Sequence, residues 1–171
     1  LFQEPLPLKE EFFHEAEHRS IAIPSLQEVF EKFGTHFVYN LEIKPAVRTY
    51  RPLLNQLIHL IQDFKLQEHV WVSSFDPYFL WLWYRRGTDI PGGYLFGNLS
   101  SRICWMCRQS FVQLLHPHTS LLKNQERLLN FNKSLCFWTV NDDEVYREIV
   151  KFRPFAVISD NIPLVMKKNP Q

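Results

Sequence analysis

The chain of 171 residues is 46% hydrophobic and 22% charged, a composition typical of one globular domain that buries a substantial core. Its formal net charge of +1 provides neither a basic stripe for nucleic acid nor a polybasic face for a membrane, and no nucleic-acid partner is expected. The longest run of apolar and aromatic residues extends from Tyr78 to Tyr84. This run is too short to cross a bilayer, so no transmembrane segment is expected.

The cysteines favour structural thiols over a metal centre. Cys104 and Cys107 have the two-residue gap of a zinc or redox pair, but the only other cysteine is Cys136. No Cys/His pair at matching spacing completes a site. Structural thiols are typical of a reducing compartment, and we therefore expect a cytoplasmic protein.

The first elements along the chain are predicted by local signals. Residues 1–22 carry several glutamates without apolar periodicity, and we expect an irregular N-terminal segment there. Ser25 and Glu28 form a capping box, which predicts a helix that ends at Gly34. Apolar and polar residues then alternate over 37–44, which predicts a strand that presents Glu42 and Lys44 on the same face.

Strands and helices continue to alternate through the rest of the chain. Further helices are expected at 53–64, 77–87, around Cys104, near Leu128 and at 143–150. Further strands are expected at 70–75, 93–96, 111–115, 135–140 and 155–159, which makes six strands in total. Trp81 and Trp83 are two residues apart in one helix, so they lie on different faces and at least one is expected at the surface.

This order of elements predicts an α/β fold with parallel strands, because each helix returns the chain to the same edge of the sheet. Two architectures satisfy it, a doubly wound open sheet and a (β/α)8 barrel. No glycine-rich phosphate loop follows any expected strand, which removes the main signature of nucleotide-binding open sheets.

Polar residues recur where the expected strands end. They are Glu42, Lys44, Asp76, His116, Asn141 and Asp160. In a (β/α)8 barrel these ends open on one face, which is the face that carries the chemistry of barrel enzymes. Helix caps and turns also require such residues, and this alternative remains open for Asp76, Asn141 and Asp160.

Glu42 and Lys44 have two interpretations. On a solvated face they form an ordinary surface ion pair that contributes little. At a barrel mouth, Glu42 is able to hold a hard cation through oxygen while Lys44 contacts a phosphoryl oxygen.

Six segments in register resemble the glycerophosphodiester phosphodiesterase family. They are 23–29, 40–44, 73–76, 116–118, 138–142 and 158–163. The resemblance implies an incomplete TIM (β/α)8 barrel with about six of its eight parallel strands. Residues 23–171 would be the C-terminal part of that domain, with the first two barrel strands absent. It also implies hydrolysis of glycerophosphodiesters to glycerol phosphate and an alcohol, in lipid metabolism, with calcium or magnesium.

The resemblance assigns roles to four residues. Glu42 would be a metal ligand, Lys44 a phosphate contact, and Trp138 and Phe75 parts of the substrate wall. The family's His-Arg-Gly, Glu-x-Asp and His-Asp segments, which supply the acid/base histidines and two metal carboxylates, do not occur in this sequence. The catalytic residues are therefore unknown.

His116 and His118 lie at an expected strand end and are the candidates to replace the acid/base groups. They are also explained as residues of an ordinary turn around Pro117, and this is the favoured interpretation.

Two functions follow. The first is a metal-dependent phosphodiesterase whose remaining catalytic groups are not among these residues, since Glu42 alone cannot assemble a calcium or magnesium site. The second is a catalytically inactive barrel that binds a phosphorylated ligand or a protein. A sheet that lacks two strands also leaves unpaired edges at the strands of Glu42 and Val157, which favours self-association.

Overall fold

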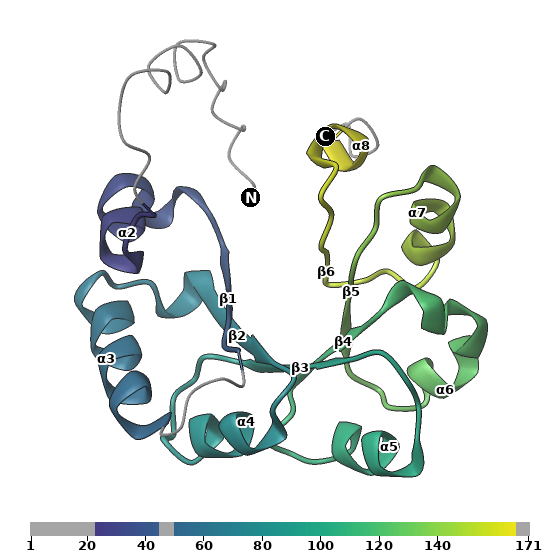
Figure 1. Ribbon diagram of the computed structural model, residues 1–171, viewed down its shortest axis with the longest axis horizontal. Helices are drawn as coiled ribbons and strands as arrows, with labels where there is room; N and C mark the ends of the chain where they lie inside the picture. Colours follow the sequence, from purple (N-terminus) through teal and green to yellow (C-terminus); the bar gives the residue numbers. More distant parts are fainter. Residues whose placement is uncertain (1–22, 45–49, 167–171) are drawn as a thin grey trace.

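The computed structural model describes residues 23–44 and 50–166, which form one curled parallel sheet with helices outside it (Figure 1). The sheet order is β1-β2-β3-β4-β5-β6, and every neighbouring pair is parallel. The helices are α2 (Leu26–Phe33), α3 (Tyr50–Asp63), α4 (Pro77–Tyr84), α5 (Ser101–Cys107), α6 (Gln125–Leu129), α7 (Asp143–Val150) and α8 (Ile162–Met166). The strands are β1 (Tyr39–Glu42), β2 (Val70–Ser74), β3 (Gly92–Phe96), β4 (Leu114–Pro117), β5 (Ser134–Phe137) and β6 (Ala156–Val157).

Short 3₁₀ turns η2 (Gly34–His36), η3 (Gln67–His69) and η4 (Thr119–Asn124) complete the described elements. The fold confirms the predicted α/β class and the incomplete TIM barrel with six parallel strands. The expected segment 1–22 lies outside the described residues, so its structure stays a prediction.

The capping box of α2 forms as predicted. Ser25 Oγ accepts from the backbone N–H of Glu28 at 3.2 Å, and the Glu28 carboxylate accepts from the backbone N–H of Ser25 at 2.7 Å. The backbone N–H and the hydroxyl of Ser25 both donate to the Glu28 carboxylate, and these hydrogen bonds lower the pKa of Glu28 below its usual value. Gly34 follows the helix with φ of 49°, a conformation that favours glycine.

Four strands, including β5 at 134–137 in place of the predicted 135–140, are clearly shorter than, or shifted from, the predicted ranges, because pairing with a neighbour decides where a strand begins and ends. The predicted strand 37–44 pairs only from Tyr39, which is the register partner of Val70 at the start of β2. The predicted strand 111–115 is replaced by β4, since Leu114 is the residue that pairs with Gly93. At the end of the chain, β6 covers two residues within the predicted 155–159.

Contacts between distant strands show that the sheet is curled rather than flat. The ring of Trp71, in β2, packs against Phe155, just before β6, with centroids 5.3 Å apart. Phe75 follows β2 and packs against Trp138, which follows β5, at 5.4 Å. Since β2 is separated from β5 by two strands, these contacts require the sheet to curl strongly, as Figure 1 shows.

The core lies between the outer face of the sheet and the helices. Val70, Val72, Tyr94, Leu115 and Phe137 point outward and pack in it. Alternation along each strand directs the intervening residues to the inner face, which we call the lumen. The lumen residues of β1 to β5 include Asn40, Trp71, Ser73, Gly93, Leu95, His116 and Cys136.

The edges of the curled sheet are β1 and β6. Among the described residues, β1 pairs only with β2 and β6 only with β5. Exposed apolar side chains lie beside both edges, with Phe37 and Val38 before β1 and Phe155 before β6.

No helix in the described part of the chain is long and apolar enough to cross a membrane.

Candidate active site

The carboxyl ends of the six parallel strands lie at one end of the sheet, which we call the mouth. The side chains gathered there that carry the candidate chemistry are Glu42, Lys44, Phe75, His118 and Trp138. This end of a parallel barrel is where binding groups are usually displayed. The mouth therefore defines the candidate active site.

Glu42 and Lys44 lie on one side of β1, as the alternation predicts. Lys44 Nζ donates to Glu42 Oε1 at 2.5 Å, and the two side chains are 70% and 32% exposed respectively. An ion pair this exposed is worth no more than about 1 kcal/mol. Both groups are thus available to exchange partners when a ligand arrives.

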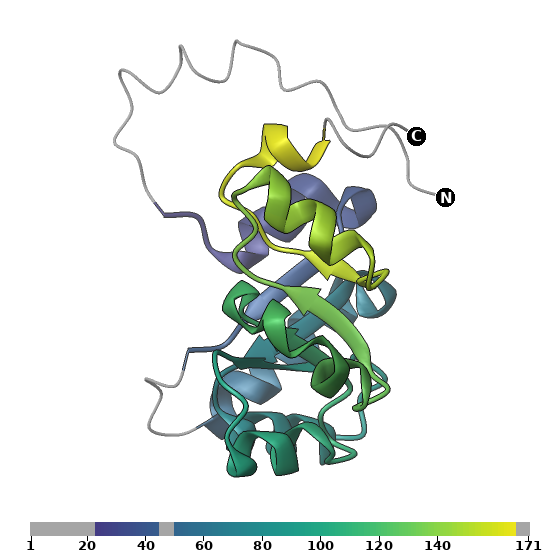
Figure 2. The ribbon, with the colours of Figure 1, turned by 90° about the vertical axis from the view of Figure 1, so that its right-hand side faces the viewer.

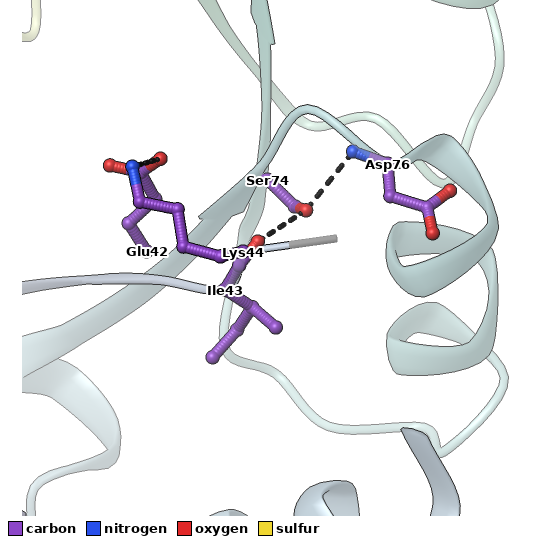
Figure 3. Close-up of polar contacts among 5 residues, drawn as sticks. All are labelled: Glu42, Ile43, Lys44, Ser74 and Asp76. Carbon is purple, nitrogen blue, oxygen red and sulfur yellow. Dashed lines mark hydrogen bonds and ion pairs between the residues drawn. The ribbon is translucent and has the colours of Figure 1, made fainter. Parts of the chain in front are cut away.

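The strand end that carries this pair is held by Ser74. Its hydroxyl donates to the carbonyl of Ile43 at 2.7 Å and accepts from the backbone N–H of Asp76 at 3.0 Å. Figure 3 shows this chain of hydrogen bonds on the side of the strand away from the Glu42 carboxylate. Ser74 is fully buried, so it fixes the backbone from which Lys44 projects.

Asp76 acts as a helix cap. Its carboxylate accepts from the backbone N–H of Tyr78 at 2.9 Å and from the hydroxyl of Tyr50 at 2.6 Å. Burial, with the neighbouring Asp76, raises the pKa of Tyr50 to about 12. The carboxylate points toward α4 and away from Glu42 in Figure 3, which confirms the capping interpretation of this residue.

The two residues expected in the substrate wall meet at the mouth. The rings of Phe75 and Trp138 are nearly perpendicular, at 89°, with Phe75 40% exposed. Trp138 Nε1 donates to the carbonyl of His116 at 2.8 Å, which fixes the orientation of the indole. The rings of His118 and Trp138 also pack edge to face, with centroids 4.7 Å apart. Two residues 63 positions apart in sequence therefore form one aromatic surface.

His118 has the role predicted for a turn residue. It is the N-cap of η4, where its ring accepts from the backbone N–H of Ser120 at 3.2 Å. Its Nδ1 also lies 2.8 Å from Ser120 Oγ. One ring nitrogen is thereby committed to the turn.

The turn interpretation is wrong for His116. This residue lies inside β4, is fully buried, and points into the lumen. Its ring lies directly over Gly93, since a Cβ at that glycine would be 2.5 Å from His116 Nε2. Burial lowers the pKa of His116 to about 4. A buried neutral imidazole is a poor general acid.

The lumen contains buried polar atoms, and of the residues that carry them the sequence had singled out only His116. Asn40 Oδ1, Trp71 Nε1, Ser73 Oγ and both ring nitrogens of His116 are buried without a hydrogen-bond partner. The sequence did contain a signal for Trp71 and Ser73. They precede Phe75 at intervals of two residues, and residues at this interval in a strand share one face of the sheet. A buried polar group without a partner is costly, so the lumen is suited to polar groups or water.

Asn141 and Asp160 bond to each other across the ends of β5 and β6. Asn141 Nδ2 donates to the Asp160 carboxylate at 2.9 Å, and the backbone N–H of Asp160 donates to Asn141 Oδ1 at 2.9 Å. Asp142 caps α7 by accepting from the N–H groups of Glu144 and Val145. These contacts agree with the turn and cap alternative for both Asn141 and Asp160.

The described residues do not by themselves fit a divalent cation. Within 23–44 and 50–166, no group of three or more His, Cys, Asp or Glu side chains is close enough to hold one. Asp76 and Asp160 are committed to the hydrogen bonds above, which leaves Glu42 as the available carboxylate. Calcium and magnesium need about six oxygen ligands.

Two surface hollows lie away from the mouth. One, of about 310 Å³, is bordered by α5 and α6, and the other, of about 450 Å³, by α3 and the segment after α4. Neither is lined by any of the five mouth residues. The arrangement of charged and aromatic groups, rather than an enclosed cavity, is what marks the mouth as the candidate site.

Fold and mouth together define an α/β protein of the TIM-barrel type in which six strands form a curled half-barrel. No family model matches the chain. A glycerophosphodiester phosphodiesterase from Caldanaerobacter subterraneus subsp. tengcongensis is 41% identical over 142 residues, which cover 81% of this chain and 58% of that protein. The resemblance to the glycerophosphodiester phosphodiesterase family inferred from the six segments is confirmed.

Solved structures show the same fold. A glycerophosphodiester phosphodiesterase from Parabacteroides distasonis matches with a TM-score of 0.64 and 18% identity, over 75% of this chain and 55% of that one. A phosphodiesterase from Oleispira antarctica, solved with the product sn-glycerol-3-phosphate, matches with a TM-score of 0.58 and 22% identity, over 84% and 60% of the two chains. This chain thus spans between half and two thirds of each of these three proteins, which fits a partial domain.

Proposed function

We propose that this chain is part of a phosphoric diester hydrolase that cleaves glycerophosphodiesters to glycerol 3-phosphate and an alcohol, in lipid metabolism. The 41% identity to a glycerophosphodiester phosphodiesterase supports this substrate class. The observation that carries the proposal is the meeting of Phe75 and Trp138 at the same end of the half-barrel as Lys44 and Glu42. An aromatic wall beside an ammonium group suits a substrate with a carbon chain and a phosphate.

Four of the mouth residues have a role in this proposal. The Lys44 ammonium, 70% exposed, binds a phosphoryl oxygen and offsets charge that develops there. Phe75 and Trp138 bind the glycerol or alcohol part through apolar contact. Glu42 provides one oxygen ligand for calcium or magnesium, and further ligands and the general acid come from groups outside the described residues.

An alternative is a catalytically inactive half-barrel that binds a phosphorylated ligand through Lys44 and the aromatic wall. The absence of a carboxylate cluster among the described residues favours it. In this alternative, binding needs no cation and does not depend on Glu42.

One set of measurements separates the two functions. Release of glycerol phosphate from glycerophosphocholine and glycerophosphoethanolamine is measured with calcium, with magnesium and with chelator. The chain is compared with Glu42→Gln and with the control Glu68→Gln, an exposed glutamate at the opposite end of the sheet just before β2. Binding of glycerol 3-phosphate is measured in parallel for Lys44→Met.

Binding of glycerol 3-phosphate that needs calcium or magnesium and weakens in Glu42→Gln but not in Glu68→Gln is the result expected of the hydrolase. Metal-dependent turnover is expected only where the remaining ligands and the general acid are also present. Binding that survives chelation and Glu42→Gln, but weakens in Lys44→Met, without turnover, is the result expected of the inactive half-barrel. Absence of both turnover and binding in a folded chain would contradict both.

A further inference from the structure

Helix α4 is apolar on both of its faces. Phe79, Leu80 and Trp83 are buried in the core, whereas Tyr78, Trp81 and Tyr84 on the other face are 57%, 42% and 44% exposed. A helix that is apolar all round is normally buried on all sides. The sequence-based expectation that one of Trp81 and Trp83 is exposed is confirmed, and Trp81 is the exposed one.

The neighbouring helix α5 also carries an exposed tryptophan. Trp105 of α5 is 59% exposed, and Figures 1 and 2 show α4 and α5 next to each other, on the side of the molecule opposite α8. We call Tyr78, Trp81, Tyr84 and Trp105 the aromatic face. Tyr78 and Trp81 stack with centroids 5.9 Å apart, so part of this face is already ordered. None of its four indole N–H and phenol groups has a hydrogen-bond partner within the described residues.

Each exposed tryptophan is accompanied by an arginine. The Arg85 guanidinium lies over the Trp81 ring, 5.9 Å from its centroid. Arg102 is three residues before Trp105, which places both on one face of α5. No ion pair in the described part of the chain involves Arg85 or Arg102. Neither helix contains an acidic residue, and Asp89 is the only one between 77 and 113.

We propose that the aromatic face binds the surface of a membrane that contains anionic lipids. Tryptophan and tyrosine combine an apolar ring with a polar edge, which is why they concentrate at the interface between lipid chains and water. Arginines without carboxylate partners complement the phosphates of the lipid head groups. The net charge of +1 conceals this local excess of positive charge, because the acidic residues lie elsewhere in the chain.

A second copy of the chain is a poorer occupant of this surface. Two such faces packed together would bring Arg85 and Arg102 against their counterparts, without a carboxylate on either helix to neutralise them. A membrane surface supplies both the apolar layer and the negative charge.

The test is flotation of the whole chain with lipid vesicles. Vesicles of phosphatidylcholine are compared with vesicles that also contain phosphatidylglycerol. The chain is expected to float with the mixed vesicles more than with phosphatidylcholine alone, and less at high salt. The double substitution Trp81→Ser and Trp105→Ser is expected to weaken partitioning roughly tenfold or more.

Two controls separate the aromatic face from other apolar surface. Leu129→Ser removes an exposed side chain of α6, and Val38→Lys alters the open edge at β1; both are expected to float as the unaltered chain does. Arg85→Gln with Arg102→Gln keeps the rings and is expected to lose only the preference for phosphatidylglycerol. The proposal is overturned if the chain does not float, if the tryptophan variant floats unchanged, or if that variant instead dissociates a dimer.

Discussion

His116 illustrates how burial alone changes what a residue is able to do. Its imidazole is fully enclosed in the lumen, without a hydrogen-bond partner among the described residues, and its pKa falls to about 4. The side chain is therefore neutral at physiological pH. Its packing against Gly93, rather than acid/base chemistry, is the role that the structure supports.

Stability should decline as the pH falls because of this one residue. Below the usual histidine pKa of 6.5, the unfolded chain takes up a proton that the folded chain accepts only near pH 4. Between pH 6.5 and pH 4 the free energy of unfolding falls by about 3 kcal/mol, and above pH 6.5 this residue causes no loss. Urea unfolding of the chain and of His116→Gln at pH 7, 5 and 4 measures it. Equal pH dependence in the two proteins would show that His116 is not the cause.

Gly93 should not tolerate a methyl group. In Gly93→Ala the added Cβ would meet the His116 ring at 2.5 Å, so the chain must shift, at a cost of about 1–3 kcal/mol. Gly97→Ala is the matched control, because no atom lies within 4 Å of its added Cβ. Denaturant unfolding compares both variants, and His116→Ala added to Gly93→Ala should recover part of the loss. Equal stability of the two glycine variants would contradict this packing.

The adjacent residues Ser73 and Ser74 of β2 lie on opposite faces of the sheet, because successive side chains of a strand point to opposite faces. Ser74 points outward and links the end of β1 to the start of α4. Ser73 points into the lumen, and its hydroxyl has no partner. Within β2, Ser74 therefore stabilises the mouth through two hydrogen bonds, whereas Ser73 contributes a buried hydroxyl without a partner.

Ser74→Ala should therefore destabilise the protein, and Ser73→Ala should not. Removal of the Ser74 hydroxyl leaves the Ile43 carbonyl and the Asp76 N–H unsatisfied, at a cost of about 1–3 kcal/mol. Removal of the Ser73 hydroxyl should be neutral or slightly stabilising. The free energy of unfolding from urea titration compares the two. A similar loss in both variants would indicate that Ser73 has a partner in solution.

In the part of the chain that the structure describes, the molecule is a curled sheet whose edge strands β1 and β6 each pair on one side only. Unpaired strand edges readily pair with another chain, and the exposed Phe37, Val38 and Phe155 add apolar contact beside them. Self-association through the edges is therefore a prediction for the isolated chain.

Val38→Lys should reduce that association. A lysine beside β1 would put a charge where a second sheet has to approach, while Val38 itself is already 51% exposed and its loss leaves the core intact. Sedimentation analysis over a range of concentrations compares this variant with Leu129→Lys, an exposed position on α6. If both lysines have the same effect on mass, association does not use the β1 edge.

The sequence determined the order of the elements, the parallel sheet and the α2 capping box, because these depend on local periodicity and on residues within a few positions. The pattern over 37–44 also determined that Glu42 and Lys44 share a face. The six motif segments determined the family resemblance, although the residues that complete a metal site or supply the acid are not among them.

Only the tertiary structure decided which residues meet. In the folded chain Phe75 contacts Trp138, and Asp76 caps α4. His116 is buried, whereas Trp81 lies at the surface. The tertiary structure also shortened the predicted strands, since a strand begins where its neighbour offers a partner. These outcomes depend on the curl of the sheet, which arises from the packing of all six strands, and local patterns do not contain it.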